Sequence, residues 1–352
     1  MEVGLLTLGD RIDDPLTTHS PTDAERHRIV VEQAVAAEAA GFSAVHLGEH
    51  HFSEYVLTSP PVVLAAIAER TTTLRLSNGV ALAANLDPVR TAEDYATVDA
   101  LSGGRLGPCF GRGSIYPDVY TQFGQSPDEA TARFAENVRL IDLLWRSDEP
   151  VDWSGEFRAP LTDVVVHPRP VQRPRPPLWI GGGWSPDTVR LAVEIGAWLM
   201  LPTVLGTWEM FRPIVESYVE QWDAAGRDPA DRRVGCCSHV WIGPDGAEAR
   251  ERWEKRYVRY LTAVDRWVRE SHERAGLEAP GRSMVGDYDA MLSSVAICGS
   301  PEEVIDRMGV AADTLSLDTQ LAMVDLGGAP LDEITDTIEM LGQTVIPSVA
   351  SL

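Results

Sequence analysis

"EVGLLTLG" (2–9), "TDAERHRIVVEQAVAAEAAG" (22–41) and "FSAVHLG" (42–48) are the stretches that determine the fold class of this chain. The first and third are short and mostly apolar, which is typical of strands buried on both faces. The second has apolar residues at helical spacing and ends on a glycine, as helices often do. A strand, a helix and a strand in this order predict a right-handed βαβ unit with parallel strands.

The same alternation continues to the end of the chain. Eight strand–helix units predict a (β/α)8 TIM barrel, which we expect to form a single domain over residues 1–352. A doubly wound sheet is the alternative, but no GxGxxG follows the first strand. The remaining strands are expected over 74–83, 105–113, 177–183, 197–202, 234–243 and the apolar run that begins at Gln320.

Two segments interrupt the alternation. Residues 147–176 are rich in proline and aspartate, and we interpret them as a hairpin-like insertion because the alternation resumes immediately afterwards. Residues 276–292 have turn-forming residues and little periodicity. Such a loop is either a variable connection or a mobile lid over an active site.

The charge of the chain excludes several classes of partner. Thirty basic residues against 53 acidic ones leave a net charge of −23. Binding to nucleic acid requires a basic surface, and an anionic membrane repels an acidic protein. We therefore expect neither a nucleic acid nor a membrane as partner.

The cysteines indicate a reducing compartment. Cys109, Cys236, Cys237 and Cys298 form no CxxC motif and no disulfide framework. Adjacent Cys236 and Cys237 are expected to pack within a strand. Because the N-terminus has no basic, apolar signal-peptide pattern, we expect a cytoplasmic protein.

The stretch "GEHHFSEY" (48–55) is the strongest candidate for a functional site, because it follows the second strand. Active sites of these barrels lie at that end of the strands. His46 to His50 matches H-x-x-E-H, but this zinc motif requires a helix, so we expect no metal site. The histidines either satisfy loop backbone or carry out proton transfer.

Four stretches together resemble the bacterial luciferase-like flavin monooxygenase superfamily, and the resemblance covers nearly the whole chain. They are "GEHHF" (48–52), "LRLSNGVALAANLDPVRTAEDYATVDALSGGRL" (74–106), "GRG" (111–113) and "PPLWIGGGWSPDT" (176–188). The resemblance implies that His50 is catalytic over the reactive edge of the flavin, and that Glu49 and His51 orient it and the ring. A residue that titrates near neutrality suits this proton chemistry. The resemblance also implies that Asp118 lies near His50 and is catalytic, although Asp118 also suits a turn or helix start.

The same resemblance implies which residues hold the cofactor. Arg112 would bind its phosphate, since a guanidinium fork matches phosphate oxygens. Ser185 is the expected N-cap of a helix whose first turn contains Thr188, and a helix N-terminus attracts anions. The family has a non-proline cis peptide under the flavin ring, and the matching bond joins Gly79 to Val80. Gly183 and Trp184 complete the cofactor-binding set.

This chain also departs from the luciferase branch. Gly111 stands where that branch has a reactive cysteine, and Trp184 stands where it has a glutamate. Cys109 is expected on the same side of its strand as Gly111 but one layer deeper. Thiol chemistry at the flavin is therefore not expected.

Three functions fit these residues. The first is a two-component monooxygenase that takes reduced FMN from a separate NAD(P)H:flavin reductase, forms a C4a-peroxide with molecular oxygen and oxidises a small organic, apolar substrate. The second is an F420-dependent oxidoreductase on the same fold, and the third is a non-catalytic flavin-binding subunit. The EHH run favours FMN over F420. By family analogy we also expect a homodimer.

Overall fold

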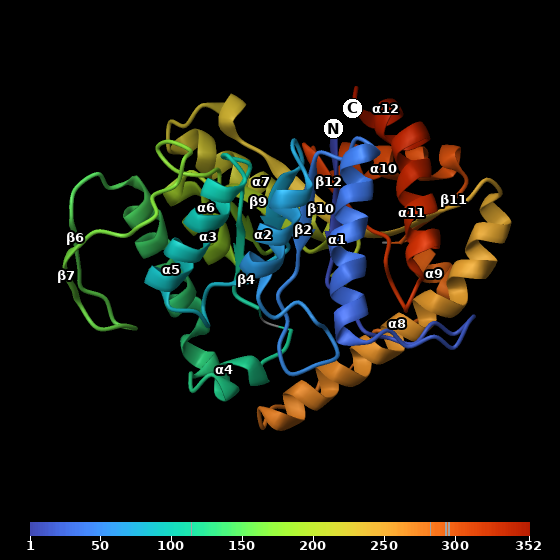
Figure 1. Ribbon diagram of the computed structural model, residues 1–352, viewed down its shortest axis with the longest axis horizontal. Coiled ribbons are helices and arrows are strands. Elements are labelled where there is room, and N and C mark those ends of the chain that lie inside the picture. Colours follow the sequence, from blue (N-terminus) through green and yellow to red (C-terminus); the bar gives the residue numbers. More distant parts are fainter. Residues whose placement is uncertain (114, 282, 293, 295) are drawn as a thin grey trace.

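Eight parallel strand positions form the centre of the protein in the computed structural model, which describes residues 1–113, 115–281, 283–292, 294 and 296–352 (Figure 1). The predicted barrel is confirmed. Its strands follow the path β3-β2-β1-β12-β10-β9-β8-β5-β4. In chain order they are β1 (Glu2–Thr7), β2 (Ala44–Leu47), β3 (Arg75–Asn78), β4 (Ala81–Leu82), β5 (Cys109–Gly111), β8 (Trp179–Gly181), β9 (Trp198–Leu201), β10 (Val234–Ile242) and β12 (Thr319–Met323).

The two ends of this path meet at the third barrel position. β3 pairs with β2, whereas β4 pairs with β5, and only Gly79 and Val80 separate β3 from β4. A further parallel bridge joins Leu76 to Leu106. The interrupted third strand therefore closes the barrel, and it places residues 79 and 80 between the strand ends of β2 and β5.

Helices on the outside of the barrel connect successive strands, and their termini follow local sequence signals. Thr22 and Ser300 each form a capping box, and Asp87 accepts hydrogen bonds from the backbone N–H groups of Val89 and Arg90. The outer helices are α1 (Asp23–Ala39), α2 (Pro60–Arg70), α3 (Pro88–Leu101), α5 (Ala130–Arg146), α6 (Pro186–Ile195), α7 (Trp208–Ala224), α10 (Pro301–Leu315), α11 (Leu331–Met340) and α12 (Ile346–Val349).

The predicted hairpin within residues 147–176 is present. Its strands β6 (Val151–Trp153) and β7 (Leu161–Val164) pair antiparallel and lie outside the barrel (Figure 1). The end of the insertion is fixed to the barrel by Asp99, whose carboxylate accepts hydrogen bonds from the backbone N–H groups of Val171 and Gln172. The polar composition of the insertion thus matches its exposed position.

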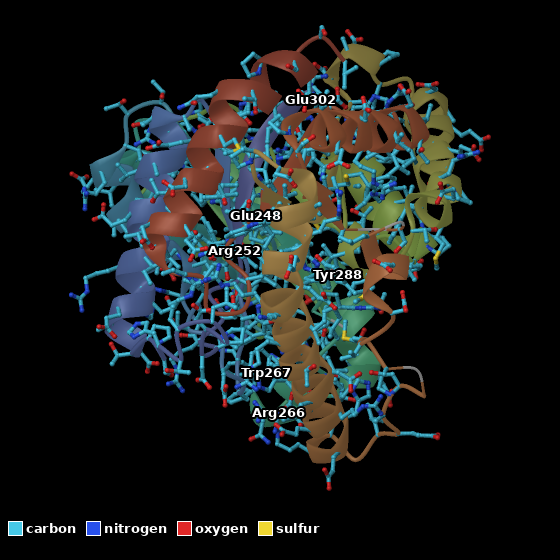
Figure 2. All side chains as sticks on the ribbon, turned by 90° about the vertical axis from the view of Figure 1, so that its right-hand side faces the viewer. Glu248, Arg252, Arg266, Trp267, Tyr288 and Glu302 are labelled. Carbon is cyan, nitrogen blue, oxygen red and sulfur yellow. The ribbon has the colours of Figure 1, made fainter. Side chains whose placement is uncertain are left out.

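One helix, α8 (Gly246–Arg274), is much longer than the others and crosses the carboxyl ends of the strands. At about 1.5 Å per residue its 29 residues span about 43 Å. Figure 2 shows Glu248 and Arg252 towards its start and Arg266 and Trp267 towards its far end. Among the described residues, no helix has the length and apolarity needed to cross a membrane.

The chain returns from α8 along the same side of the barrel. The return segment, residues 275–296, contains the short helix α9 (Tyr288–Leu292) and leads into β11 (Ile297–Gly299), which pairs with β10. Of the predicted lid over 276–292, Arg282 lies outside the described residues. The Pro280 carbonyl accepts from Arg269, and the Met284 N–H donates to Asp265. Whether this segment moves stays a prediction.

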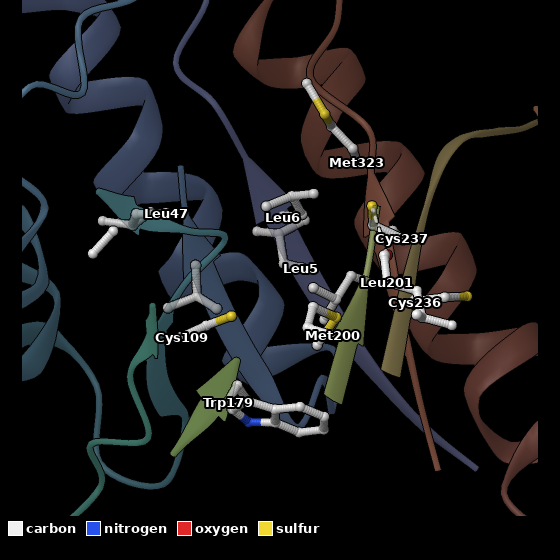
Figure 3. Packing of buried hydrophobic residues seen from close by; sticks show 14 of the residues in the cluster. Leu5, Leu6, Leu47, Cys109, Trp179, Met200, Leu201, Cys236, Cys237 and Met323 are labelled. Atoms are coloured by element: carbon white, nitrogen blue, oxygen red, sulfur yellow. Dashed lines mark hydrogen bonds between the residues drawn. The ribbon is translucent and has the colours of Figure 1, made fainter. Parts of the chain in front are cut away.

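Apolar side chains fill the barrel interior. Figure 3 shows buried residues of neighbouring strands, among them Leu5, Leu6, Met200 and Leu201. Consecutive residues of a strand point to opposite faces, so one of each pair faces the interior and the other faces the surrounding helices. Cys236 and Cys237 are both buried in β10, as expected for strand packing. The interior is therefore a packed core, and functional groups are confined to the strand ends.

Candidate functional site

The predicted site residues follow four strand positions that are neighbours in the barrel. β2 carries the His50 loop, the third position carries Gly79 and Val80, β5 carries Arg112, and β8 carries the glycine run before Ser185. Gly111 pairs in register with Gly181, so Arg112 and Gly182 leave adjacent strand ends. The structure thus brings together on one side of the rim most of the residues that the sequence indicated.

His50 lies in an aromatic cluster. Its ring stacks on Tyr55 with centroids 4.2 Å apart and meets Tyr116 edge-on at 5.4 Å. Removal from water, with a smaller contribution from neighbouring His51, lowers the pKa of His50 to about 3. The imidazole is therefore neutral at pH 7, which differs from the expected group titrating near neutrality. Because the imidazolium would be desolvated there, His50 does not carry a standing charge, and its neutral ring offers one N–H donor and one acceptor nitrogen for hydrogen bonds.

The Glu49 side chain contacts His51 and the backbone of β4 through hydrogen bonds. Its buried carboxylate lies 2.8 Å from His51 Nε2 and accepts a hydrogen bond of 2.9 Å from the Leu82 N–H. The Glu49 N–H donates to the Val80 carbonyl at 3.0 Å. Glu49 thereby ties the histidine loop to both sides of the interrupted third strand.

The Gly79–Val80 peptide bond is cis, as the family resemblance implied. The Val80 side chain lies between two glycines of neighbouring strands. A Cβ atom at position 111 or at position 181 would overlap Val80 side-chain atoms. Gly111 and Gly181 therefore leave the space that Val80 occupies, and this explains why no cysteine stands at position 111.

Arg112 follows β5 and is half-buried. Its guanidinium donates to the hydroxyl of Thr131, and its carbonyl accepts from the hydroxyl of Tyr120. Within the described parts of this acidic chain, no carboxylate lies within 4.0 Å of the Arg112 guanidinium. Its remaining N–H donors are available for an anion.

The N-terminus of α6 lies near Arg112, because Arg112 follows β5, α6 follows β8, and these two strands pair side by side. Ser185 caps this helix by accepting from the Asp187 N–H at 3.3 Å, and the Thr188 N–H donates to the Ser185 carbonyl. Gly183 has no room for a side chain, because a Cβ there would lie 2.6 Å from the Phe211 ring. Trp184 packs on that ring and is 52% exposed, so its indole remains partly open to a ligand.

Asp118 is the first residue of α4 (Asp118–Gln122) and is fully buried. Arg274 Nε donates to its Oδ2 atom at 2.7 Å, and the Ser271 hydroxyl donates to its Oδ1 atom. Both carboxylate oxygens are thus bound to the far end of α8. The predicted catalytic role of Asp118 beside His50 stays a prediction.

Sequence reasoning missed several residues of the site. Tyr55 and Tyr116 contact His50, and the Tyr55 hydroxyl lies 3.2 Å from that of Tyr260 in α8. Tyr55 lies in the quoted stretch 48–55 and Tyr116 lies two residues before Asp118, whereas nothing in the sequence marks Tyr260. Among the described residues, no three His, Cys, Asp or Glu side chains are arranged to hold a metal ion.

Comparison with known proteins gives the family. A family profile described as luciferase-like monooxygenase matches residues 1–317. The oxygenase component of a flavin-dependent trigonelline monooxygenase from Acinetobacter baylyi is 26% identical over 342 residues, which cover 93% of this chain and 90% of that protein. An F420-dependent glucose-6-phosphate dehydrogenase from Amycolatopsis mediterranei is 31% identical over 176 residues, 48% of this chain and 51% of that protein.

A solved structure agrees with this result. The monooxygenase RslO1 from Streptomyces bottropensis superposes with a TM-score of 0.85 at 26% identity, over 99% of both chains. The family profile covers most of the chain, and the relatives use flavin or F420. This chain therefore belongs to the luciferase-like monooxygenase family.

Proposed function

We propose that the chain is the oxygenase component of a two-component monooxygenase, which binds reduced FMN from a separate NAD(P)H:flavin reductase and oxidises a small organic substrate with molecular oxygen. The observation that carries the proposal is Arg112, an arginine without a carboxylate partner among the described residues, beside the N-terminus of α6 and on the same side of the rim as His50. The trigonelline relative, an oxygenase component, supports the separate reductase. A homodimer and a cytoplasmic location stay predictions.

The residues present fit a flavin phosphate and ring. Arg112 and the Ser185 hydroxyl offer donors for the phosphate, and the positive end of the α6 dipole favours an anion there. Gly79 and Val80 would support the ring, and the buried Nδ1 atom of His50 has no hydrogen-bond partner among the described residues. The bound reduced flavin would supply the activation of oxygen. Neutral His50 would hold or move a proton at its edge, while the aromatic cluster excludes water.

A cavity of about 260 Å³ supports an apolar substrate. It lies between α8, the return segment and the loops after β5 and β9. Its charged groups Asp265 and Arg269 are paired with each other at 2.7 Å, so they do not require a charged ligand. The apolar wall consists of Ile115, Leu205, Val268, Pro280 and Met284, and the remaining lining residue, His272, has its Nδ1 atom 2.8 Å from the Val268 carbonyl. Ile115 adjoins Tyr116, which contacts His50.

The test compares two flavins that differ in the phosphate. Under anaerobic conditions, reduced FMN and reduced riboflavin are titrated into wild type, Arg112→Ala and the control Arg28→Ala. Arg28 is an exposed arginine of α1 that bonds its own helix. Charge-assisted hydrogen bonds contribute roughly 1.5–3 kcal/mol, so we expect Arg112→Ala to weaken FMN binding roughly 10- to 100-fold. Riboflavin binding should not change in either variant.

Turnover is then measured as oxygen consumption with a flavin reductase and NADH. We expect His50→Gln to retain flavin binding and lose turnover. Flavin binding without turnover in the wild type would support a non-catalytic subunit instead, and turnover retained in His50→Gln would show that His50 is not catalytic. If F420 binds in place of FMN, hydride transfer without oxygen replaces the proposal. If neither cofactor binds, Arg112 does not hold a cofactor phosphate and the proposal fails.

A further inference from the structure

The far end of α8 contacts the two rim loops that carry the candidate site. Arg274, the last residue of the helix, donates from Nε to Asp118 Oδ2 at 2.7 Å. Its Nη2 atom donates to the Phe52 carbonyl at 3.2 Å. One guanidinium thus binds both the loop after β2, which contains His50, and the segment after β5, which contains Arg112.

Ser271 strengthens this contact one turn earlier in α8. Its hydroxyl donates to Asp118 Oδ1, and its oxygen lies 3.3 Å from the Asp118 backbone N–H. Asp118 and Ser271 are fully buried, whereas the Arg274 side chain is 37% exposed. A buried carboxylate requires such partners, because an unpaired charge in this position is strongly unfavourable. The three residues therefore form a fixed junction between α8 and the rim.

This junction lies two residues from Tyr116, one of the aromatic contacts of His50, and two residues from His50 itself. Asp118 is two residues after Tyr116, whose ring meets His50 edge-on at 5.4 Å. Phe52 is two residues after His50 itself. Since His50 Nδ1 has no hydrogen-bond partner among the described residues, ring packing and the loop backbone set the orientation of the imidazole.

We propose that Arg274 and Asp118 are a positioning pair that sets the orientation of the His50 imidazole. Arg274 fixes the loop backbone through Phe52, and Asp118 fixes Tyr116 through the start of α4. In this proposal both residues act through these contacts and not on the reacting atoms, so it is an alternative to the catalytic role predicted for Asp118. The effect on turnover rests on the proposed function, but the effect on His50 does not.

The test observes the His50 ring directly. The protein is labelled with ¹³C at histidine Cε1, and the His50 resonance is assigned by its loss in His50→Gln. In Arg274→Gln and in Asp118→Asn we expect the His50 resonance to shift, while the resonances of His46 and His239, in β2 and β10, remain in place. Lys255→Gln removes one charge from an exposed site on the same helix and is expected to leave His50 unchanged.

Arg274→Lys separates positioning from folding. Lysine keeps the charge beside Asp118 but lacks the planar fork that also binds the Phe52 carbonyl, so we expect an intermediate shift in a stable protein. Turnover should fall roughly 10- to 100-fold in Arg274→Gln with flavin affinity retained, as for a displaced catalytic group. An unchanged His50 resonance in folded Arg274→Gln or Arg274→Lys overturns the proposal. A shifted resonance with full turnover supports positioning and counts against the catalytic role of His50.

Discussion

Gly111 offers a quantitative test of the packing around Val80. A Cβ at position 111 would lie 2.9 Å from Val80 Cβ, 3.1 Å from Cγ1 and closer still to Cγ2. Val80 is β-branched, with one preferred rotamer at most sites, and a Cβ at Gly181 would press on it from the other side. Neither the side chain nor its neighbours can move aside without a cost. Gly111→Ala is therefore an overpacking substitution, expected to lower the free energy of unfolding by about 1–3 kcal/mol.

Val80→Ala should relieve part of this cost. It removes the two methyl carbons, of which Cγ2 is the closest, but leaves the Cβ approach of 2.9 Å, and because Val80 is half-buried it should itself cost about 1 kcal/mol. In the Val80→Ala background, the cost of Gly111→Ala should then be lower than in the wild type by about 1 kcal/mol or more. The coupling between the two positions is expected at roughly 1–2 kcal/mol, within the usual range for residues in contact.

Urea unfolding of the wild type, both single variants and the double variant measures this coupling, since the midpoint and slope give the free energy of unfolding. Gly107→Ala is the matched control, because a Cβ there meets only Pro177 at an ordinary 3.6 Å. The reasoning is refuted if Gly111→Ala costs no more than Gly107→Ala. It is also refuted if Gly111→Ala costs the same with and without the Val80 methyl groups.

Two further predictions concern buried titrating groups. Burial lowers the pKa of His239 to about 3, below the ordinary value of about 6.5, so unfolding takes up a proton between these values. The free energy of unfolding of the wild type, relative to that of His239→Gln, should therefore fall by about 1.4 kcal/mol per pH unit as the pH drops from about 6 to 5. Urea unfolding of both proteins measures this difference, and the same pH dependence in both would contradict the prediction. Burial also raises the pKa of the Cys109 thiol well above its ordinary value. All four cysteines are buried, so an aromatic disulfide reagent should label none of them in the folded protein and all four in denaturant; rapid labelling of one folded thiol would contradict the assigned packing.

The sequence predicts those features that depend on neighbouring residues in the chain. Alternating strand and helix patterns located the eight barrel positions, and Ser185 before Pro186 located the cap of α6. The EHH run was correctly placed after β2, because strand ends are marked by the change from apolar to polar residues. The proposed phosphate site follows from these local signals combined with the parallel order of the strands.

Contacts between distant segments could not be predicted in the same way. Ser271 and Arg274 lie more than 150 positions from Asp118, and a charged helix gives no sign of which strand end it crosses. The direction of the Glu49 side chain, towards His51 and Leu82, depends on the bend of a loop. The low pKa of His50 likewise depends mainly on its removal from water by tertiary packing, and only in smaller part on His51 of the motif.

The chain leaves the barrel at Gly243, forms α8 and α9, and returns at Gly299, and these two ends of the segment lie side by side. The Gly243 N–H donates to the Gly299 carbonyl at 3.1 Å, and Trp241 pairs in register with Cys298. A segment whose ends are adjacent can be lengthened, shortened or exchanged without altering the path of the chain that bears it. Val268 and Met284 of the cavity wall belong to this segment, whereas Arg112 and the start of α6 belong to the barrel. An exchanged segment would therefore reshape the cavity, and it would preserve the setting of His50 only if it kept the contacts that Ser271 and Arg274 make.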